Sequence, residues 1–267
     1  MKPILRQLVA EQTDAWRKRN VAREYLQVRI LQALQDSGAF SNWALLGGTA
    51  LRLLYALPRY SEDLDFSTRD SSDHARFEER IPRVCNDLTR ETYTVDFTTR
   101  SSAAVHSAFV RFPGLPYELG FSPHREQVLS IRVEIDTNPP AGAGVATRVV
   151  RRYILLHVLH HDKASLFAGK LHAILARPYT KGRDLYDLVW YLSDSTWPGP
   201  NLAQLNNALA QTGWNGPSIT EANWREVVAE RLDRVDWDKA VKDVSPFLER
   251  SRDLELLSHS VVISLLK

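Results

Sequence analysis

The sequence predicts an α/β (α+β) fold, in which a mixed β-sheet with flanking helices precedes a helical C-terminal region. Three observations predict it. Residues 43–46 form a short apolar run that ends at Gly47 and Gly48, as at a strand-to-helix turn. Residues 128–136 alternate apolar and polar side chains, which is typical of a half-buried strand. From residue 163 onward, apolar residues recur at helical spacing.

The expected elements follow from these patterns in chain order. Residues 14–36 read as one long helix that Gly38 ends. Residues 71–73 can cap a helix that runs to about residue 88, and Pro82 is expected to kink or interrupt it. Strands are expected at 43–46, 63–66, 93–98, 105–112, 128–136 and 147–153. Further helices are expected at 50–57, 163–177, 182–194, 201–211, 220–234, 237–249 and 252–266.

Composition is that of a soluble globular protein. Hydrophobic residues make up 44% of the 267 residues and charged residues 25%. The net charge of +2 is too small to indicate nucleic-acid binding, so any basic surface must be local. Cys85 is the single cysteine, which excludes an intramolecular disulfide. No apolar run resembles a signal peptide or a membrane span. We expect a cytoplasmic protein without a membrane segment, with domains at 1–155 and 156–267.

Two carboxylates stand out because they come shortly after the glycine turn, with one short helix between. Asp63 and Asp65 alternate along the expected strand, so both point to one face with Cα atoms about 6.6 Å apart. Two anions repel unless cations lie between them, and hard oxygen ligands suit Mg²⁺ brought in with a phosphate substrate. Gly47 and Gly48 leave backbone N–H groups exposed at the positive end of a helix. Thr49 can cap that helix and reach a phosphate oxygen.

This segment and a second one together resemble a known family. Residues 47–54 and 61–67 read GGTALRLL and SEDLDFS, which resemble motif I of the polymerase-beta-like nucleotidyltransferases. Residues 168–177 and 181–188 read AGKLHAILAR and KGRDLYDL, which resemble that superfamily's AbiEii-like group, the toxins of type IV toxin–antitoxin systems. The resemblance implies a nucleotidyltransferase-type sheet, a helical domain and an active site in the cleft between them. It also implies an NTP substrate, Mg²⁺ or Mn²⁺, a tRNA 3′ end as acceptor, blocked translation and a cognate antitoxin encoded alongside.

A third metal carboxylate is expected on the strand at 128–136. The resemblance places this ligand on a strand flanked by aliphatic residues, and Glu134 is our choice because Val133 and Ile135 bracket it. Asp136 shares the same face and stays an alternative. So does an ordinary pair between Arg132 and Glu134 at a solvated sheet edge.

Basic residues line one expected helix at intervals of seven. Lys163, Lys170 and Arg177 form one stripe because two helical turns span about 7.2 residues. An ordinary solvent face explains such a stripe equally well. The resemblance implies that Lys170 binds the β- and γ-phosphates and neutralises the leaving pyrophosphate. It also implies that Arg183 and Asp184 line the nucleotide cleft, with Asp184 orienting Lys170 or acting on the attacking hydroxyl. Lys163 and Arg177 are the candidates for RNA phosphate contacts.

Three alternatives stay open at this point. Asp184 lies near a helix start, where an acidic residue also stabilises the helix dipole. The acceptor could be a protein or a small molecule instead of tRNA. A non-catalytic module that binds RNA or a partner through the basic helix is the alternative from another class. The Asp63 and Asp65 pair argues against it, because a binding module has no need of two repelling carboxylates beside a phosphate loop.

Overall fold

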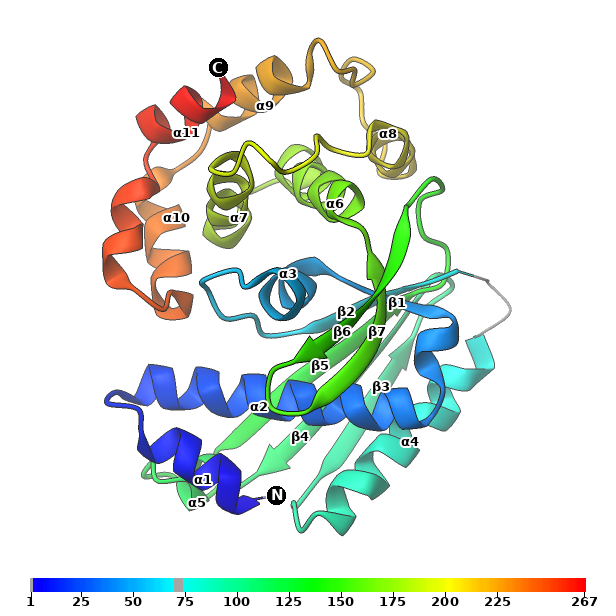
Figure 1. The fold of residues 1–267 in the computed structure, drawn as a ribbon, viewed down its shortest axis with the longest axis vertical. Coiled ribbons are helices and arrows are strands. Elements are labelled where there is room, and N and C mark those ends of the chain that lie inside the picture. The colour runs from blue at the N-terminus through cyan, green and yellow to red at the C-terminus, as the bar shows by residue number, and fades with distance from the viewer. Residues whose placement is uncertain (1, 70–73) are drawn as a thin grey trace. The chain divides into compact units, whose positions relative to one another are not determined.

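The computed structural model describes residues 2–69 and 74–267 and has the mixed α/β fold that the sequence predicts (Figure 1). The strands β1 to β7 cover Trp43–Leu46, Leu64–Thr68, Asp96–Ser101, Val105–Pro113, Val128–Asp136, Val145–Arg151 and Leu155–His161. Within the described residues they form one seven-stranded sheet in the order β3-β4-β5-β2-β1-β7-β6. β1 is antiparallel to β2 and parallel to β7, β2 is parallel to β5, and β4 is antiparallel to β3 and β5.

Most of the helices agree with the predicted ones in place and differ in length. They are α1 Lys2–Ala10, α2 Ala15–Asp36, α3 Gly47–Tyr55, α4 His74–Arg90, α5 Leu115–Glu118, α6 Lys163–Ala176, α7 Gly182–Leu192, α8 Leu202–Gln211, α9 Trp224–Leu232, α10 Trp237–Val244 and α11 His259–Leu266. Across residues 2–69 and 74–267, none of them has the length and apolar character that a membrane span requires.

The chain divides into two compact units that interleave along the sequence. The first comprises Met1–Leu54, Tyr60–Asn138 and Thr147–His160. The second comprises Tyr55–Arg59, Pro139–Ala146 and His161–Lys267.

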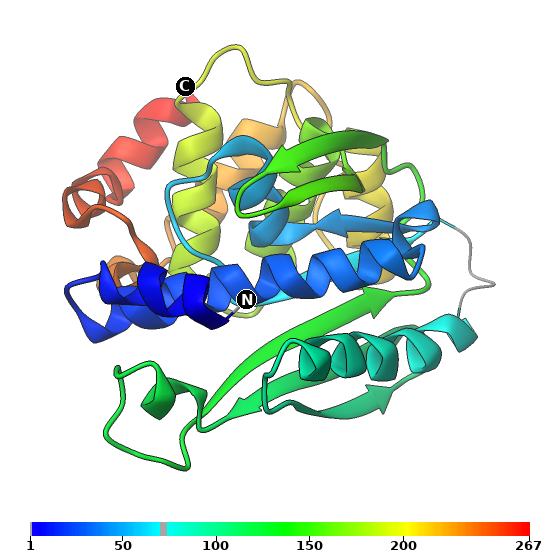
Figure 2. The same ribbon diagram turned by 60° about the horizontal axis from the view of Figure 1, so that its bottom comes forward.

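In the first unit, α2 and α4 pack against each other and against the strands β3, β4 and β5 (Figure 2). Trp43 of β1 joins this layer to the sheet, because its ring lies 5.8 Å from Phe77 of α4 and 5.6 Å from Phe66 of β2. Phe66 is paired in register with the buried Ile135 of β5, so both side chains face the helices. Residues that alternate with Phe66 and Ile135 therefore face the other side of the sheet.

The long helix α2 confirms the predicted start and stop signals. Asp14 caps it by accepting a hydrogen bond from the backbone N–H of Arg17. Gly38 adopts a φ of +74° just beyond its end, which a glycine allows without strain. The preceding helix α1, which the sequence analysis did not predict, buries Leu5 and Val9.

Two local predictions in the first unit are corrected. α3 begins at Gly47, so Thr49 lies in its first turn and does not cap it. α4 continues through Pro82, so the expected interruption is wrong, and Ile81 and Val84 on either side are fully buried. Residues 71–73, the expected caps of this helix, lie outside the described residues.

The sheet also contains a strand that was not predicted. β7 follows β6 and pairs in parallel with β1 through His160 and Leu45. β3 begins at Asp96, three residues later than expected, and the preceding Tyr93 packs edge-on against Phe112.

The second unit is helical, as predicted, with an aromatic core. Phe167 of α6 stacks on Tyr191 of α7 at 4.4 Å, and the Trp224 ring meets Phe167 edge-on. Its last helices are shorter than expected. α10 ends at Val244 and is followed by the 3₁₀ turn Ser245–Phe247, which contains Pro246. α11 begins after Ser258, whose side chain caps it.

Candidate active site

Three carboxylates lie on the face of the sheet opposite the helices α2 and α4. The register of the parallel strands β2 and β5 places Asp65 directly opposite Glu134. Neighbouring strands are about 4.8 Å apart, so these two side chains emerge side by side. Asp63 immediately precedes β2 and is reached by an arginine that also contacts Glu134. We call Asp63, Asp65 and Glu134 the carboxylate group.

Asp136, the alternative third ligand, lies two residue pairs further along the same strands, opposite Ser67. Its carboxylate accepts a hydrogen bond from the backbone N–H of Asn138 at 2.9 Å. Burial raises the pKa of the Asp136 carboxyl. The register thus supports the choice of Glu134, which stays a prediction.

The glycine turn is adjacent to this group. Gly47 has a φ of +74°, and a Cβ built on it would lie 2.7 Å from the Oδ2 atom of Asp65. A side chain at this position would therefore collide with the carboxylate. Thr49 is buried, and its hydroxyl donates a hydrogen bond to the backbone carbonyl of Asp63. Gly48 is buried in the same helical turn. Thr49 thus joins the start of α3 to the start of β2, and contact of this turn with a phosphate stays a prediction.

Arg132 belongs to this site, although the sequence analysis considered it only as an ordinary partner of Glu134. Its guanidinium lies 2.7 Å from Glu134 and 3.8 Å from Asp63, with 37% of the side chain exposed. It thereby offsets part of the repulsion within the carboxylate group. As the side chains stand, no three His, Cys, Asp or Glu residues among those described form a metal-binding array. The donor chemistry nevertheless suits a hard divalent cation, because Asp65 and Glu134 are paired across neighbouring strands and Gly47 leaves room beside the Asp65 carboxylate.

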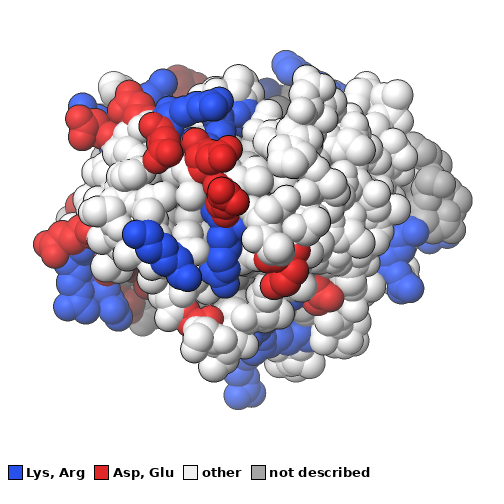
Figure 3. All heavy atoms as spheres, turned by 90° about the horizontal axis from the view of Figure 1, so that it is seen from above, with Lys and Arg blue, Asp and Glu red and all other residues white. Residues whose placement is uncertain are grey.

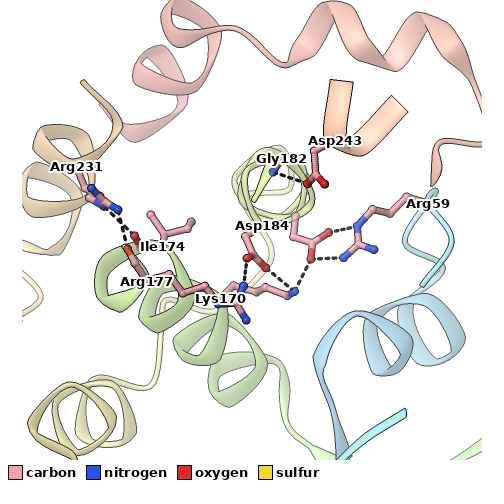
Figure 4. Close-up of polar contacts among 9 residues, drawn as sticks. Arg59, Lys170, Ile174, Arg177, Gly182, Asp184, Arg231 and Asp243 are labelled. Carbon is pink, nitrogen blue, oxygen red and sulfur yellow. Dashed lines mark hydrogen bonds and ion pairs between the residues drawn. The ribbon is translucent and has the colours of Figure 1, made fainter. Parts of the chain in front are cut away.

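Three of the remaining predicted residues, Lys170, Arg177 and Asp184, lie in the second unit in a chain of ion pairs (Figure 4). The Lys170 ammonium lies 3.1 Å from Asp184 and 2.8 Å from Asp187. Arg177 pairs with the other oxygen of Asp184. Arg59 donates two hydrogen bonds of 2.6 Å to the two oxygens of Asp187. We call these five residues the ion-pair cluster.

The ion-pair cluster has one positive charge in excess, because it contains three cations and two carboxylates. Burial lowers the pKa of the Lys170 ammonium, but Asp187 and Asp184 outweigh burial and raise it above its ordinary value. Burial raises the pKa of Asp184, but Lys170 and Arg177 outweigh burial and hold it below its ordinary value. Lys170 and Asp184 are therefore both charged near neutral pH.

The other predicted residues of α6 and α7 have different surroundings. Lys163 lies 4.1 Å from the centre of the Trp197 ring and 5.4 Å from that of Tyr55, which is cation–π geometry. Arg183 lies 4.5 Å from the ring of Phe247. The stripe of Lys163, Lys170 and Arg177 is thus not a uniform solvent face. The carboxylate group and the ion-pair cluster belong to different units, so their expected meeting in one cleft stays a prediction.

Sequence reasoning missed Arg59 and gave Asp187 no role of its own. Asp187 is fully buried, whereas a helix start would have exposed it to solvent. Its spacing of one turn from Asp184 was the available signal. Arg59 is 128 positions from its partner, and no local pattern marks it.

The family follows from the match of this chain to known proteins. Residues 29–257 match the family model described as nucleotidyl transferase AbiEii toxin, type IV TA system. The chain belongs to the AbiEii nucleotidyltransferase toxin family. The predicted resemblance is confirmed, and as an AbiEii member the chain is a nucleotidyltransferase. The AbiEii family implies an NTP substrate and an antitoxin partner.

Solved structures agree with the fold. JHP933 from Helicobacter pylori is 19% identical, with a TM-score of 0.56 over 92% of this chain and 90% of that chain. MenT4, a nucleotidyltransferase toxin from Mycobacterium tuberculosis H37Rv, is 18% identical, with a TM-score of 0.50 over 100% of this chain and 99% of that chain. At these identities the likeness concerns the fold of this AbiEii protein alone. No curated protein sequence matches the chain.

Proposed function

We propose that this protein transfers a nucleoside monophosphate from an NTP to the 3′ end of a tRNA and thereby blocks translation. The observation that carries the proposal is the convergence of Asp65 and Glu134 across paired strands, beside the tight turn at Gly47. Such a carboxylate group next to a helix N-terminus suits a nucleotide with its divalent cation. A toxin that acts in this way works in the cytoplasm.

Asp63, Asp65 and Glu134 would hold Mg²⁺ or Mn²⁺. When bound, these cations supply charge neutralisation at the attacking and leaving oxygens. In the transfer itself, the acceptor hydroxyl oxygen bonds to the α-phosphorus, and the bond from that phosphorus to the bridging oxygen breaks. The electron pair of the broken bond leaves with pyrophosphate, and the proton of the hydroxyl passes to solvent water. Arg132 lies close enough to the carboxylate group to bind phosphate oxygens of the nucleotide.

The ion-pair cluster would serve the triphosphate end of the nucleotide. It has one positive charge in excess, and Asp184 and Asp187 hold Lys170 in place from two sides. A fixed ammonium stabilises the negative charge that develops on pyrophosphate without reorganisation during the reaction. In this proposal Asp184 orients Lys170, and Arg183 contributes at the rim of the nucleotide site.

Labelled nucleotides test the proposal. The protein is incubated with Mg²⁺, total RNA and each of the four NTPs in turn, labelled at the α-phosphate. The expected result is label on a tRNA-sized band from one or two of the NTPs. Label on protein, or on a small molecule in a cell extract, would identify a different acceptor and refute the tRNA proposal. No label in any fraction would refute transfer.

A further inference from the structure

A pocket of about 340 Å³ lies in the second unit, at the C-terminal end of α6 and beside α9. None of its lining residues belongs to the carboxylate group, and among the described residues Arg177 is the one that it shares with the ion-pair cluster. Its volume falls in the range of ligand sites in proteins, which begins at roughly 300 Å³. Three guanidinium groups and one carboxylate, that of Glu230, line it. Its charge therefore favours an anion.

One of these arginines is fixed in place by the backbone. Arg231 donates hydrogen bonds to the carbonyl oxygens of Ile174 and Arg177 at the end of α6 (Figure 4). It also donates one to the carbonyl oxygen of Pro178. The carbonyl of Ile174 belongs to the last turn of α6, where carbonyls have no partner within the helix, so Arg231 has a structural role in the wall. Arg177 and Arg234 are exposed, and both line the pocket.

An aromatic wall completes the pocket. Trp214 is half-buried, and its indole N–H donates a hydrogen bond of 3.0 Å to the carbonyl of Pro217. A Cβ on Gly216 would lie 2.2 Å from this indole, so the backbone of Gly216 packs directly against the ring. The indole is thus held rigidly where it lines the pocket. Tyr179, in the segment after Arg177, is 60% exposed.

We propose that this pocket binds one nucleotide of a single-stranded RNA, with its base against Trp214 and its phosphate at Arg234. Trp214 offers one rigid aromatic ring beside two exposed arginines, and proteins bind single strands by combining such rings with basic residues, because every base has a stacking face and every linkage a charge. The positive charge of the pocket is a local feature. The net charge of the whole chain is only +2, and basic and acidic side chains intermingle over part of the face in Figure 3. The proposal rests on RNA being the acceptor in the proposed function.

The pocket also has a physical connection to the ion-pair cluster. Arg177 lines the pocket and pairs with Asp184, which in turn holds Lys170. An RNA phosphate at Arg177 would compete with Asp184 for the guanidinium. Bound RNA would in this way affect Asp184 and Lys170, the residues proposed to act on the nucleotide.

Fluorescence anisotropy with a short labelled RNA strand tests the pocket. The full-length protein is used without NTP and with EDTA, so that binding is measured apart from transfer. Trp214→Ala should weaken binding roughly 5- to 150-fold, the range for one stacked base, and Trp214→Phe should stay close to wild type. Arg234→Ala should weaken binding and flatten its dependence on salt by about 0.7 in logarithmic slope. Arg252→Ala, an exposed arginine of the same unit outside the pocket, is the matched control.

Each outcome decides the proposal. Wild-type affinity in both Trp214→Ala and Arg234→Ala would overturn it, as would equal weakening in Arg252→Ala. Circular dichroism checks the fold, and if Trp214→Ala fails to fold, Arg234→Ala together with retained binding in Trp214→Phe decides.

Displacement of the RNA by a mononucleotide or by polyglutamate at equal concentration would show a different ligand. Binding that depends on Trp214 without any transfer to RNA would refute the proposed function and keep the pocket. Transfer to RNA that ignores both residues would refute the pocket alone.

Discussion

Replacement of Lys170 by methionine separates the structural role of the ion-pair cluster from its proposed role toward the nucleotide. The ammonium lies 2.8 Å from Asp187 and 3.1 Å from Asp184. When it is removed, each carboxylate keeps a partner, since Arg59 pairs with Asp187 and Arg177 pairs with Asp184. No buried charge is left alone, and methionine fills a similar space.

The loss of unfolding free energy should therefore be well below the roughly 3–5 kcal/mol that follows removal of one member of a buried ion pair. Asp187→Ala supplies that reference. Its carboxylate is fully buried and serves both Arg59 and Lys170, so two buried cations lose a partner at once. Urea unfolding of both variants at neutral pH gives the two free energies directly.

Lys170→Met should affect nucleotidyl transfer much more than it affects stability. Lys170→Met should lose about 10²- to 10³-fold in kcat, the effect of removing one preorganised donor from developing charge. Lys170→Arg keeps a cation and should retain more activity than Lys170→Met. The reasoning is refuted if Lys170→Met is as destabilised as Asp187→Ala, or if it is stable and transfers at the wild-type rate.

Three further predictions follow from the site geometry. Gly47→Ala should lose transfer, because its Cβ would lie 2.7 Å from a carboxylate oxygen of Asp65. Gly38→Ala is the control, because Gly38 has the same φ of +74° with open space around it. This control should lose stability in thermal unfolding and keep transfer. Glu134→Gln should weaken Mn²⁺ binding in titration calorimetry more than Asp136→Asn does, and the reverse order would move the third ligand to Asp136. The depressed pKa of Asp184 contributes stability that is complete above about pH 4, its unfolded value, and is lost as the pH falls through the lower folded value. Melting temperatures of the wild type should therefore fall more steeply below about pH 4 than those of Asp184→Asn, and parallel curves would count against this.

The strand pattern predicted which side chains share a face, and the pairing of strands decided which of them meet. Alternation placed Asp63 and Asp65 together and placed Glu134 with Asp136. Nothing local indicates that β5 lies beside β2, because Leu64 and Val128, the first residues of the two strands, are 64 positions apart. Only the tertiary register brings Glu134 opposite Asp65.

The ion-pair cluster could likewise be predicted only in part. Lys170 and Asp184 were found through a family resemblance, since periodicity alone indicates an ordinary helix face. Arg59 could not be found in this way, because a single buried arginine in a loop has no periodic signal and its partner is 128 residues away. Helix ends in the second unit were overextended: α10, expected to run to residue 249, ends at Val244, before a 3₁₀ turn that contains Pro246.

Transfer of label from NTPs marked at the α- or the γ-phosphate tests the central claim most directly. The account predicts that the α-label appears on RNA, that the γ-label leaves in pyrophosphate, and that Asp63→Ala and Asp65→Ala abolish both while circular dichroism shows the fold unchanged. Transfer within a few-fold of wild type in both variants, or γ-label on the acceptor, would contradict it.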